Sequence, residues 1–160
     1  MEDFKRFYET YRGKLFGYLM RSTGGDFSLS SDITQESFTR YLERYGDEQQ
    51  SAPLLFTIAR NALSDDRRKR KGRDAALGQN EEDASWDQEH QLMVRDDYRH
   101  VLSALEKLKK EERDVLAMVV STDFTYREIA SIAGISEANV KVKVHRARIK
   151  LRDILRKDDS

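Results

Sequence analysis

The sequence predicts an all-α fold of two small helical domains joined by a flexible acidic linker, with a helix-turn-helix in the C-terminal domain. Apolar residues recur at three- and four-residue steps in several separate segments, and no segment of useful length alternates as a strand does. Charged residues are sorted into blocks along the chain. We expect the domains to occupy residues 1–73 and 92–160, with the linker at 74–91.

The composition leaves room for modest cores and argues against several kinds of site. Of 160 residues, 36% are charged and 38% apolar, which does not suit a large catalytic architecture. Cysteine is missing and the three histidines (His90, His100 and His145) are scattered, so we predict no disulfide, metal site, catalytic residue or cofactor. Without a membrane-length apolar run or a signal-peptide pattern at the N-terminus, the protein is expected to be cytoplasmic.

The N-terminal domain is predicted to contain three helices. The first carries an apolar stripe from Phe4 to Leu19 and is ended by two glycines, Gly24 and Gly25. The second is expected to end at Gly46 and to begin at one of three candidate N-caps: Ser30, Ser31 and Asp32. The third has Pro53 in its first turn and four inward-facing residues: Leu55, Ile58, Ala59 and Ala62.

Three charge blocks divide a chain whose net charge is zero. Residues 53–73 hold seven basic and two acidic residues (+5), and residues 136–157 hold eight basic and two acidic ones (+6). Between them, residues 74–100 carry eight acidic against two basic residues (−6), and the linker there has Trp86 as its single aromatic. Two basic segments on helical sequence fit two contacts with a polyanion, and charge alone fits a pair of solvated helix faces equally well.

A capped helix, a glycine turn and a second capped helix follow one another near the C-terminus. Thr125 and Glu128 are spaced as a capping box, so a helix is expected to begin at Thr125. Gly134 can adopt the left-handed conformation that a tight turn needs, and Ser136 can cap the next helix. This spacing predicts a helix-turn-helix, whose second helix enters the major groove of DNA.

The second helix of this motif has one buried and one outward face. Five residues on one stripe are predicted to face the core: Val140, Val144, Ala147, Leu151 and Ile154. The opposite face presents Asn139, Val142 and Arg146, with Ala138 and Ile149 beside them. An outward valine next to an amide and a guanidinium is suited to contact a thymine methyl while they address base edges or phosphates.

Three segments, in order, resemble the extracytoplasmic-function sigma factors of bacterial RNA polymerase. The segment TYREIASIAGISEANVKVKVHRARIKLRDIL is similar to their second DNA-binding domain. SDITQESFTRYLERY resembles the helix that holds the clamp of core RNA polymerase, and LLFTIARNALSDDRRKRK resembles the minus-ten helix. The resemblance covers nearly the whole chain except the linker, and it implies a subunit that recruits polymerase to promoters rather than an enzyme.

The resemblance implies a role for named residues in each segment. The polymerase-binding residues would be Asp32, Gln35, Glu36 and Phe38, the last anchoring the packing. The minus-ten residues would be Arg60, Asn61, Asp65 and Arg68, with Arg67 in the same basic block, and the loop 46–52 would capture a flipped base. The minus-thirty-five residues would be Arg127, Asn139, Lys141, Lys143, Arg146 and Arg148, to which the outward face adds Val142.

The chain departs from the family pattern at two places. Leu54 replaces a tryptophan, which removes an aromatic near the melting helix, and Leu108 is followed by Lys109 rather than proline. The partners implied are core RNA polymerase, promoter DNA in duplex and single-stranded form, and an anti-sigma factor. The acidic linker, which in the family threads the RNA exit path, is hypothesised to mimic nucleic acid there.

Two other functions remain open on sequence grounds. The chain could be a different helix-turn-helix regulator, such as a response-regulator output domain joined to a helical module, but its N-terminal half lacks the βαβ alternation of a receiver. It could be a helical nuclease, but it has no phosphate-binding glycine loop and no metal-ligand spacing.

Overall fold

The computed structural model describes residues 2–47, 50–77 and 96–158, and every regular element within these ranges is an α-helix. The all-α prediction is therefore confirmed. Along the chain the helices are α1 (Glu2–Ser22), α2 (Phe27–Tyr45), α3 (Ala52–Leu77), α5 (Asp96–Glu106), α6 (Lys110–Ser121), α7 (Tyr126–Ala133) and α8 (Glu137–Asp158).

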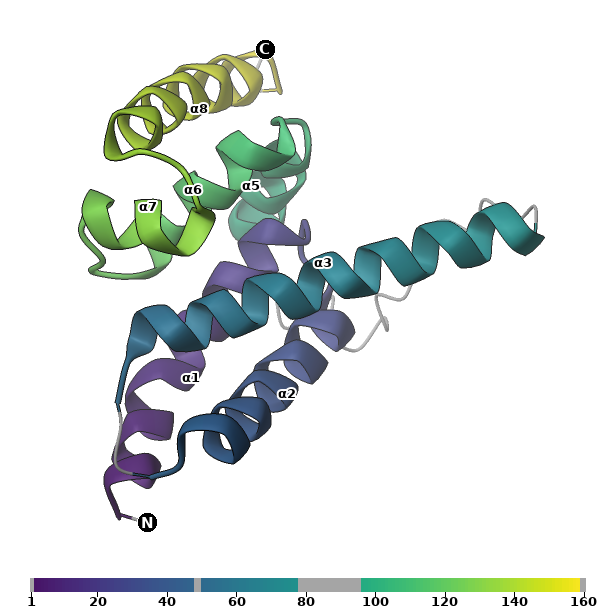
Figure 1. Ribbon diagram of the computed structural model, residues 1–160. Helices are drawn as coiled ribbons and strands as arrows, with labels where there is room; N and C mark the ends of the chain where they lie inside the picture. The colour runs from purple at the N-terminus through teal and green to yellow at the C-terminus, as the bar shows by residue number, and fades with distance from the viewer. Residues whose placement is uncertain (1, 48–49, 78–95, 159–160) are drawn as a thin grey trace.

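The first three helices pack on one another (Figure 1), and aromatic side chains lie between them. Tyr18 from α1, Tyr41 from α2 and Phe56 from α3 are all fully buried. The Tyr41 hydroxyl also accepts a hydrogen bond from the Ser51 backbone amide at 2.7 Å, which fixes the start of α3 against α2. The inward face predicted for the third helix is confirmed, because Leu55, Ile58, Ala59 and Ala62 are buried.

The second helix begins one turn earlier than its sequence predicted. Its N-cap is Asp26, whose carboxylate accepts a hydrogen bond from the Leu29 amide at 3.1 Å. The proposed caps Ser30, Ser31 and Asp32 instead lie inside the helix, and Ser30 is buried. The predicted end at Gly46 is confirmed, since its amide bonds to the Leu42 carbonyl and its φ is 70°.

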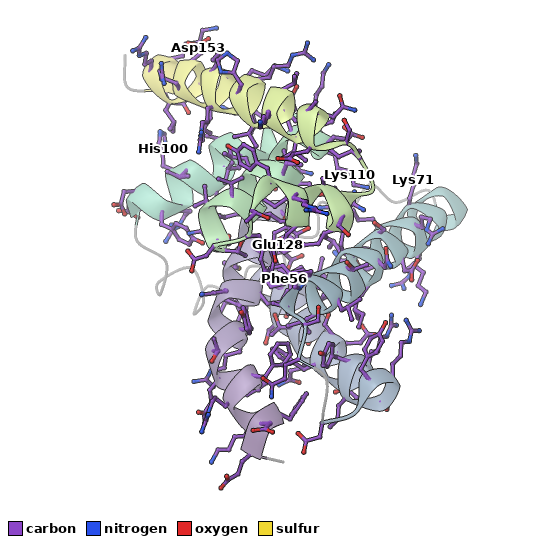
Figure 2. All side chains as sticks on the ribbon, turned by 60° about the vertical axis from the view of Figure 1, so that its left-hand side comes forward. Phe56, Lys71, His100, Lys110, Glu128 and Asp153 are labelled. Atoms are coloured by element: carbon purple, nitrogen blue, oxygen red, sulfur yellow. The ribbon has the colours of Figure 1, made fainter. Side chains whose placement is uncertain are left out.

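Helix α3 runs to Leu77, four residues past the expected end of the first domain at residue 73. Its C-terminal half, which carries Lys71, projects beyond the other helices (Figures 1 and 2). Residues 78–95, including Trp86 and most of the predicted linker, lie outside the described residues.

The N-terminal and C-terminal halves pack directly against each other, which the sequence did not indicate. Helix α1 lies along α6, and α3 contacts α7 (Figure 1). One apolar cluster contains Tyr18 and Phe56 from the first half together with Met118 and Ile129 from the second. In the part of the chain that the structure describes, no helix is long and apolar enough to cross a membrane.

Candidate nucleic-acid interface

The turn between α7 and α8 has the geometry that its sequence predicted. The Glu128 amide donates to Thr125 Oγ1 at 3.1 Å, and the Thr125 amide donates to Glu128 Oε1 at 3.0 Å, so both halves of the capping box form. Gly134 adopts φ 70° and ψ 32°, the left-handed conformation that lets the chain reverse without strain. Ser136 then caps α8 by accepting from the Asn139 amide at 3.1 Å.

An apolar stripe and an ion pair with a buried carboxylate hold α8 against the other helices. Val140, Val144 and Ala147 are buried, as predicted, against α6 and α7. At the edge of this stripe, Lys150 Nζ donates to both carboxylate oxygens of Glu112 on α6, at 2.9 and 3.1 Å. Glu112 is 5% exposed, so this bond fixes the rotation of α8 about its axis.

The opposite face of α8 is open to solvent. Asn139, Val142 and Arg146 are all exposed, and Val142 is 44% accessible. Ile149, seven residues on from Val142, is 43% accessible, so two apolar side chains lie among polar ones on the outward face. The other predicted minus-thirty-five residues are also exposed, apart from the half-buried Lys143: Arg127, Lys141 and Arg148.

The predicted minus-ten residues do not form one open surface. Asn61 and Arg68 are exposed, and Arg68 pairs with Asp65 one turn before it. Arg67 instead turns toward α1, where its guanidinium donates to the Ser22 carbonyl at 2.8 Å. Burial lowers the pKa of Arg67, and the nearby charge of Arg113 lowers it further.

Arg60 forms an ion pair with a residue for which the sequence predicted no role. Its Nε lies 2.7 Å from Asp114 Oδ2 on α6, and Tyr18 donates its hydroxyl to Oδ1 of the same carboxylate. Burial lowers the pKa of Arg60, but the charge and hydrogen bond of Asp114, together with the charges of Tyr18 and Glu111, outweigh burial and leave the pKa raised. Burial, followed by the charge of Asp114, raises the pKa of Tyr18 well above its usual value. No local sequence pattern predicts this role for Asp114, because in the sequence it resembles any other acidic residue on the polar side of an amphipathic helix.

A surface pocket of about 410 Å³ lies beside the loop predicted to capture a base. Tyr11, Lys14 and Ser51 line it from the first half of the chain, and Asp123 and Phe124 line it from the second. Loop residues 48 and 49 are outside the described part of the chain. Asp123 and Phe124 therefore face the described end of the predicted loop, residues 50–52, across this pocket.

The predicted polymerase-binding residues divide into exposed and buried ones. Asp32, Gln35 and Glu36 are exposed along α2. Phe38 is 3% exposed and packs edge-on against Tyr8, with ring centroids 4.8 Å apart, so it anchors α2 to α1 and is not itself available to a partner. Among the described residues, no group of histidine or acidic side chains is arranged to hold a metal ion.

Comparison with known proteins gives a consistent result over nearly the whole chain. Residues 98–151 match the family described as Sigma-70, region 4. The ECF RNA polymerase sigma factor EcfG of Rhodopseudomonas palustris is 30% identical over 143 residues, covering 84% of this chain and 75% of the relative. The ECF RNA polymerase sigma factor SigM of Bacillus subtilis is 30% identical over 152 residues, covering 91% and 90%.

A solved structure shares the fold. It is the sigma factor RpoE in complex with the anti-sigma factor NepR from Bartonella quintana, with a TM-score of 0.80, 21% identity and coverage of 98% of both chains. The match takes in both halves of the chain, not one domain alone.

Proposed function

This chain belongs to the extracytoplasmic-function sigma factors of RNA polymerase, and we propose that it divides promoter recognition among three helices. Helix α2 binds core polymerase, α3 holds the minus-ten strand, and α8 reads the minus-thirty-five duplex. The boundaries proposed for the two working units are residues 1–73 and 92–160, joined by the acidic segment 74–91. In this proposal the polymerase, and not this chain, carries out catalysis. The chain acts in the cytoplasm.

The outward face of α8 is the observation that carries the proposal. Its core stripe and the Glu112–Lys150 pair fix which side of the helix is presented, and that side holds Asn139, Val142 and Arg146. An amide and a guanidinium can bond to base edges, and a valine can contact a thymine methyl. Lys141 and Arg148 lie nearer the core stripe, which suits phosphate contacts that position the helix without reading sequence.

Strand opening by α3 follows from the physics of binding without nucleotide hydrolysis. Such a protein must bind the single strand better than the duplex, which offsets a few kcal/mol of unstacking per base. Exposed Asn61, Arg68 and Lys71 on α3 supply polar and cationic contacts along the helix. Leu54, in place of the family's tryptophan, removes one stacking surface there, so pairing with phosphates is proposed to carry more of the binding.

We also propose control by an anti-sigma factor. The fold is that of a sigma factor solved with such an inhibitor. An apolar groove of about 390 Å³ between α5, α6 and α8, lined by Val101, Leu105, Val120 and Leu151 and edged by arginines, would accept an apolar helix with acidic flanks from such a partner. Val120 is 58% exposed, which leaves the groove open at that point.

The proposed function is tested by in vitro transcription with sigma-free core polymerase and a promoter library. We expect the chain to bind core and to enrich templates that share an upstream and a start-proximal element. A chain that does not bind core polymerase refutes the proposal.

A matched pair of variants assigns the polymerase contact to one face of α2. Glu36→Ala is expected to weaken core binding while leaving duplex binding by α8 unchanged. Arg44→Ala is the control, because Arg44 is exposed on the same helix but lies beside the face formed by Asp32, Gln35 and Glu36, about 80° from Glu36. Equal losses of core binding in both variants would contradict the assignment.

A further inference from the structure

A basic pocket of about 80 Å³ is lined by side chains of α1, α3 and α6. Its charged residues carry a net charge of +2, with four cations against two carboxylates: Arg60, Arg67, Lys110 and Arg113 against Glu111 and Asp114. Tyr18 and Ser22 of its lining are buried, whereas Lys110 and Glu111 are exposed. The pocket therefore has a buried end and an end at the protein surface.

Two arginines of this pocket lie close together without an acidic partner. Arg67 on α3 and Arg113 on α6 form no ion pair with a carboxylate in the described part of the chain, and each donates instead to a backbone carbonyl, of Ser22 at 2.8 Å and of Glu106 at 3.4 Å. Burial lowers the pKa of Arg67, and the charge of Arg113 lowers it further. Two neighbouring cations in a partly buried place repel each other unless an anion lies between them.

The acidic side chains nearby do not supply that anion. Asp114 is engaged by Arg60, whose Nε lies 2.7 Å from its Oδ2. Burial raises the pKa of Glu106, against the opposing charge of Arg113, but the two side chains form no ion pair. Glu111 is exposed at the outer end of the pocket. The positive charge between α3 and α6 is therefore only partly compensated by the protein.

A buried hydroxyl lies at the same place. Ser22 is 3% exposed, and its Oγ forms no hydrogen bond of ordinary length and angle with a described residue. It lies beside the Tyr18 hydroxyl, whose pKa burial and Asp114 raise and Ser22 partly lowers, but Tyr18 donates its proton to Asp114. A buried polar group without a hydrogen bond is costly, and it commonly marks the place of a water, an ion or a ligand.

A phosphate group matches these donors in charge, number and size. Guanidinium groups bind phosphate oxygens through paired hydrogen bonds, and an ammonium group adds a point charge. A tetrahedral phosphate has enough oxygens to accept from two arginines, a lysine and a hydroxyl at once. A volume of about 80 Å³ holds a few water molecules or one such group, and it is too small for a stretch of nucleic acid strand.

We propose that this pocket binds one phosphate group, either free or at the end of a small molecule. Arg67 on α3 and Arg113 on α6 hold it from two sides, Ser22 Oγ donates to it at the buried end, and Lys110 closes the outer end. Lys110 lies at the start of α6, on the side turned toward α3 (Figure 2). The inference follows from the packing of the helices and does not depend on the proposed function.

The test compares phosphate binding by Arg113→Gln with that by the control Arg156→Gln. Both variants lose one positive charge, but Arg156 is exposed near the end of α8 and does not line the pocket. Sodium phosphate is titrated into the full-length chain by calorimetry, in chloride buffer of constant ionic strength. We expect Arg113→Gln to bind phosphate about tenfold more weakly than Arg156→Gln, whose affinity should equal that of the unmodified chain. Equal affinities in the two variants would overturn the proposal.

Ser22→Ala tests the buried end of the pocket without changing any charge. The substitution removes only a hydroxyl that makes no hydrogen bond, so the variant should fold and unfold with a Tm in chloride buffer no lower than that of the unmodified chain. Its phosphate affinity is expected to be about threefold lower. An unchanged affinity would overturn the position assigned to the phosphate. This variant also keeps the proposal testable if Arg113→Gln does not fold.

The choice of titrant distinguishes the sources of the phosphate group. Tighter binding of inorganic phosphate than of glycerol 3-phosphate assigns the pocket to the free anion, and the reverse order assigns it to a phosphorylated small molecule. If neither binds, or if only a short oligothymidine binds, the proposal is overturned. Failure of the unmodified chain to bind core polymerase would refute the proposed function and would leave phosphate binding unaffected.

Discussion

Replacing Lys150 by methionine tests how the recognition helix is fixed. The methionine keeps an unbranched apolar stem but removes the ammonium that bonds both oxygens of Glu112. The carboxylate is then left 5% exposed without its cationic partner. A buried acceptor without its partner costs about 1–3 kcal/mol, and since Lys150 is itself 43% exposed we take about 1.5 kcal/mol.

The loss is measured by urea unfolding, followed by far-ultraviolet circular dichroism. For a protein of this length it corresponds to a fall of about 3–6 °C in Tm. Lys141→Met is the control, because Lys141 is an exposed lysine on the same helix. The double variant Glu112→Gln with Lys150→Met should be more stable than Lys150→Met alone, since no charge then remains buried.

One result would refute this reasoning. If Lys150→Met and Lys141→Met differ by less than about 0.5 kcal/mol, the usual scatter of surface substitutions, the pair does not fix α8. The apolar stripe alone would then determine which face of α8 points to solvent.

Three further predictions concern DNA reading, helix capping and pH. Arg146→Ala should reduce discrimination between promoters, by about 1–3 kcal/mol at the contacted base, whereas Lys141→Ala should weaken binding to all duplexes evenly; competition binding on matched and mismatched duplexes distinguishes them. Thr125→Ala should lower the free energy of unfolding by about 1 kcal/mol in urea titrations, through loss of the capping box at α7, whereas an unchanged midpoint would mean that the box contributes nothing. Because the pKa of Tyr18 is raised on folding, its share of the stability is present below about pH 10 and is lost as the pH rises above that. The free energy of unfolding of Tyr18→Phe should therefore fall less steeply with pH above about pH 10 than that of the unmodified chain. Identical slopes for the two proteins would contradict this account.

Local sequence was sufficient for features that depend on neighbouring residues. The box formed by Thr125 and Glu128, the left-handed Gly134 and the cap at Ser136 all involve groups within a few positions of one another, so their spacing was enough. The inward stripe of α8 follows from helical periodicity in the same way.

Local sequence did not predict the correct N-cap where several neighbouring residues were equally good candidates. Ser30, Ser31 and Asp32 are good N-caps in isolation, but Asp26 caps α2 instead, one turn earlier. Ser30 is buried in the folded chain, a packing fact that no local pattern contains. No end was predicted for α3, which runs to Leu77, because polar helix surface and polar linker have similar compositions.

Residue spacing alone was enough to predict the helical class, the helix-turn-helix and the outward face of α8, because each is specified by interactions along a single helix or turn. Which basic residues are open to DNA depends instead on how distant helices pack. Arg60 and Arg68 read alike in the sequence, yet one is held by Asp114, 54 positions away, and the other lies on the surface. That difference arises from the packing of α6 on α1, which brings Asp114 to Arg60, and packing between distant segments has no period that a sequence can show.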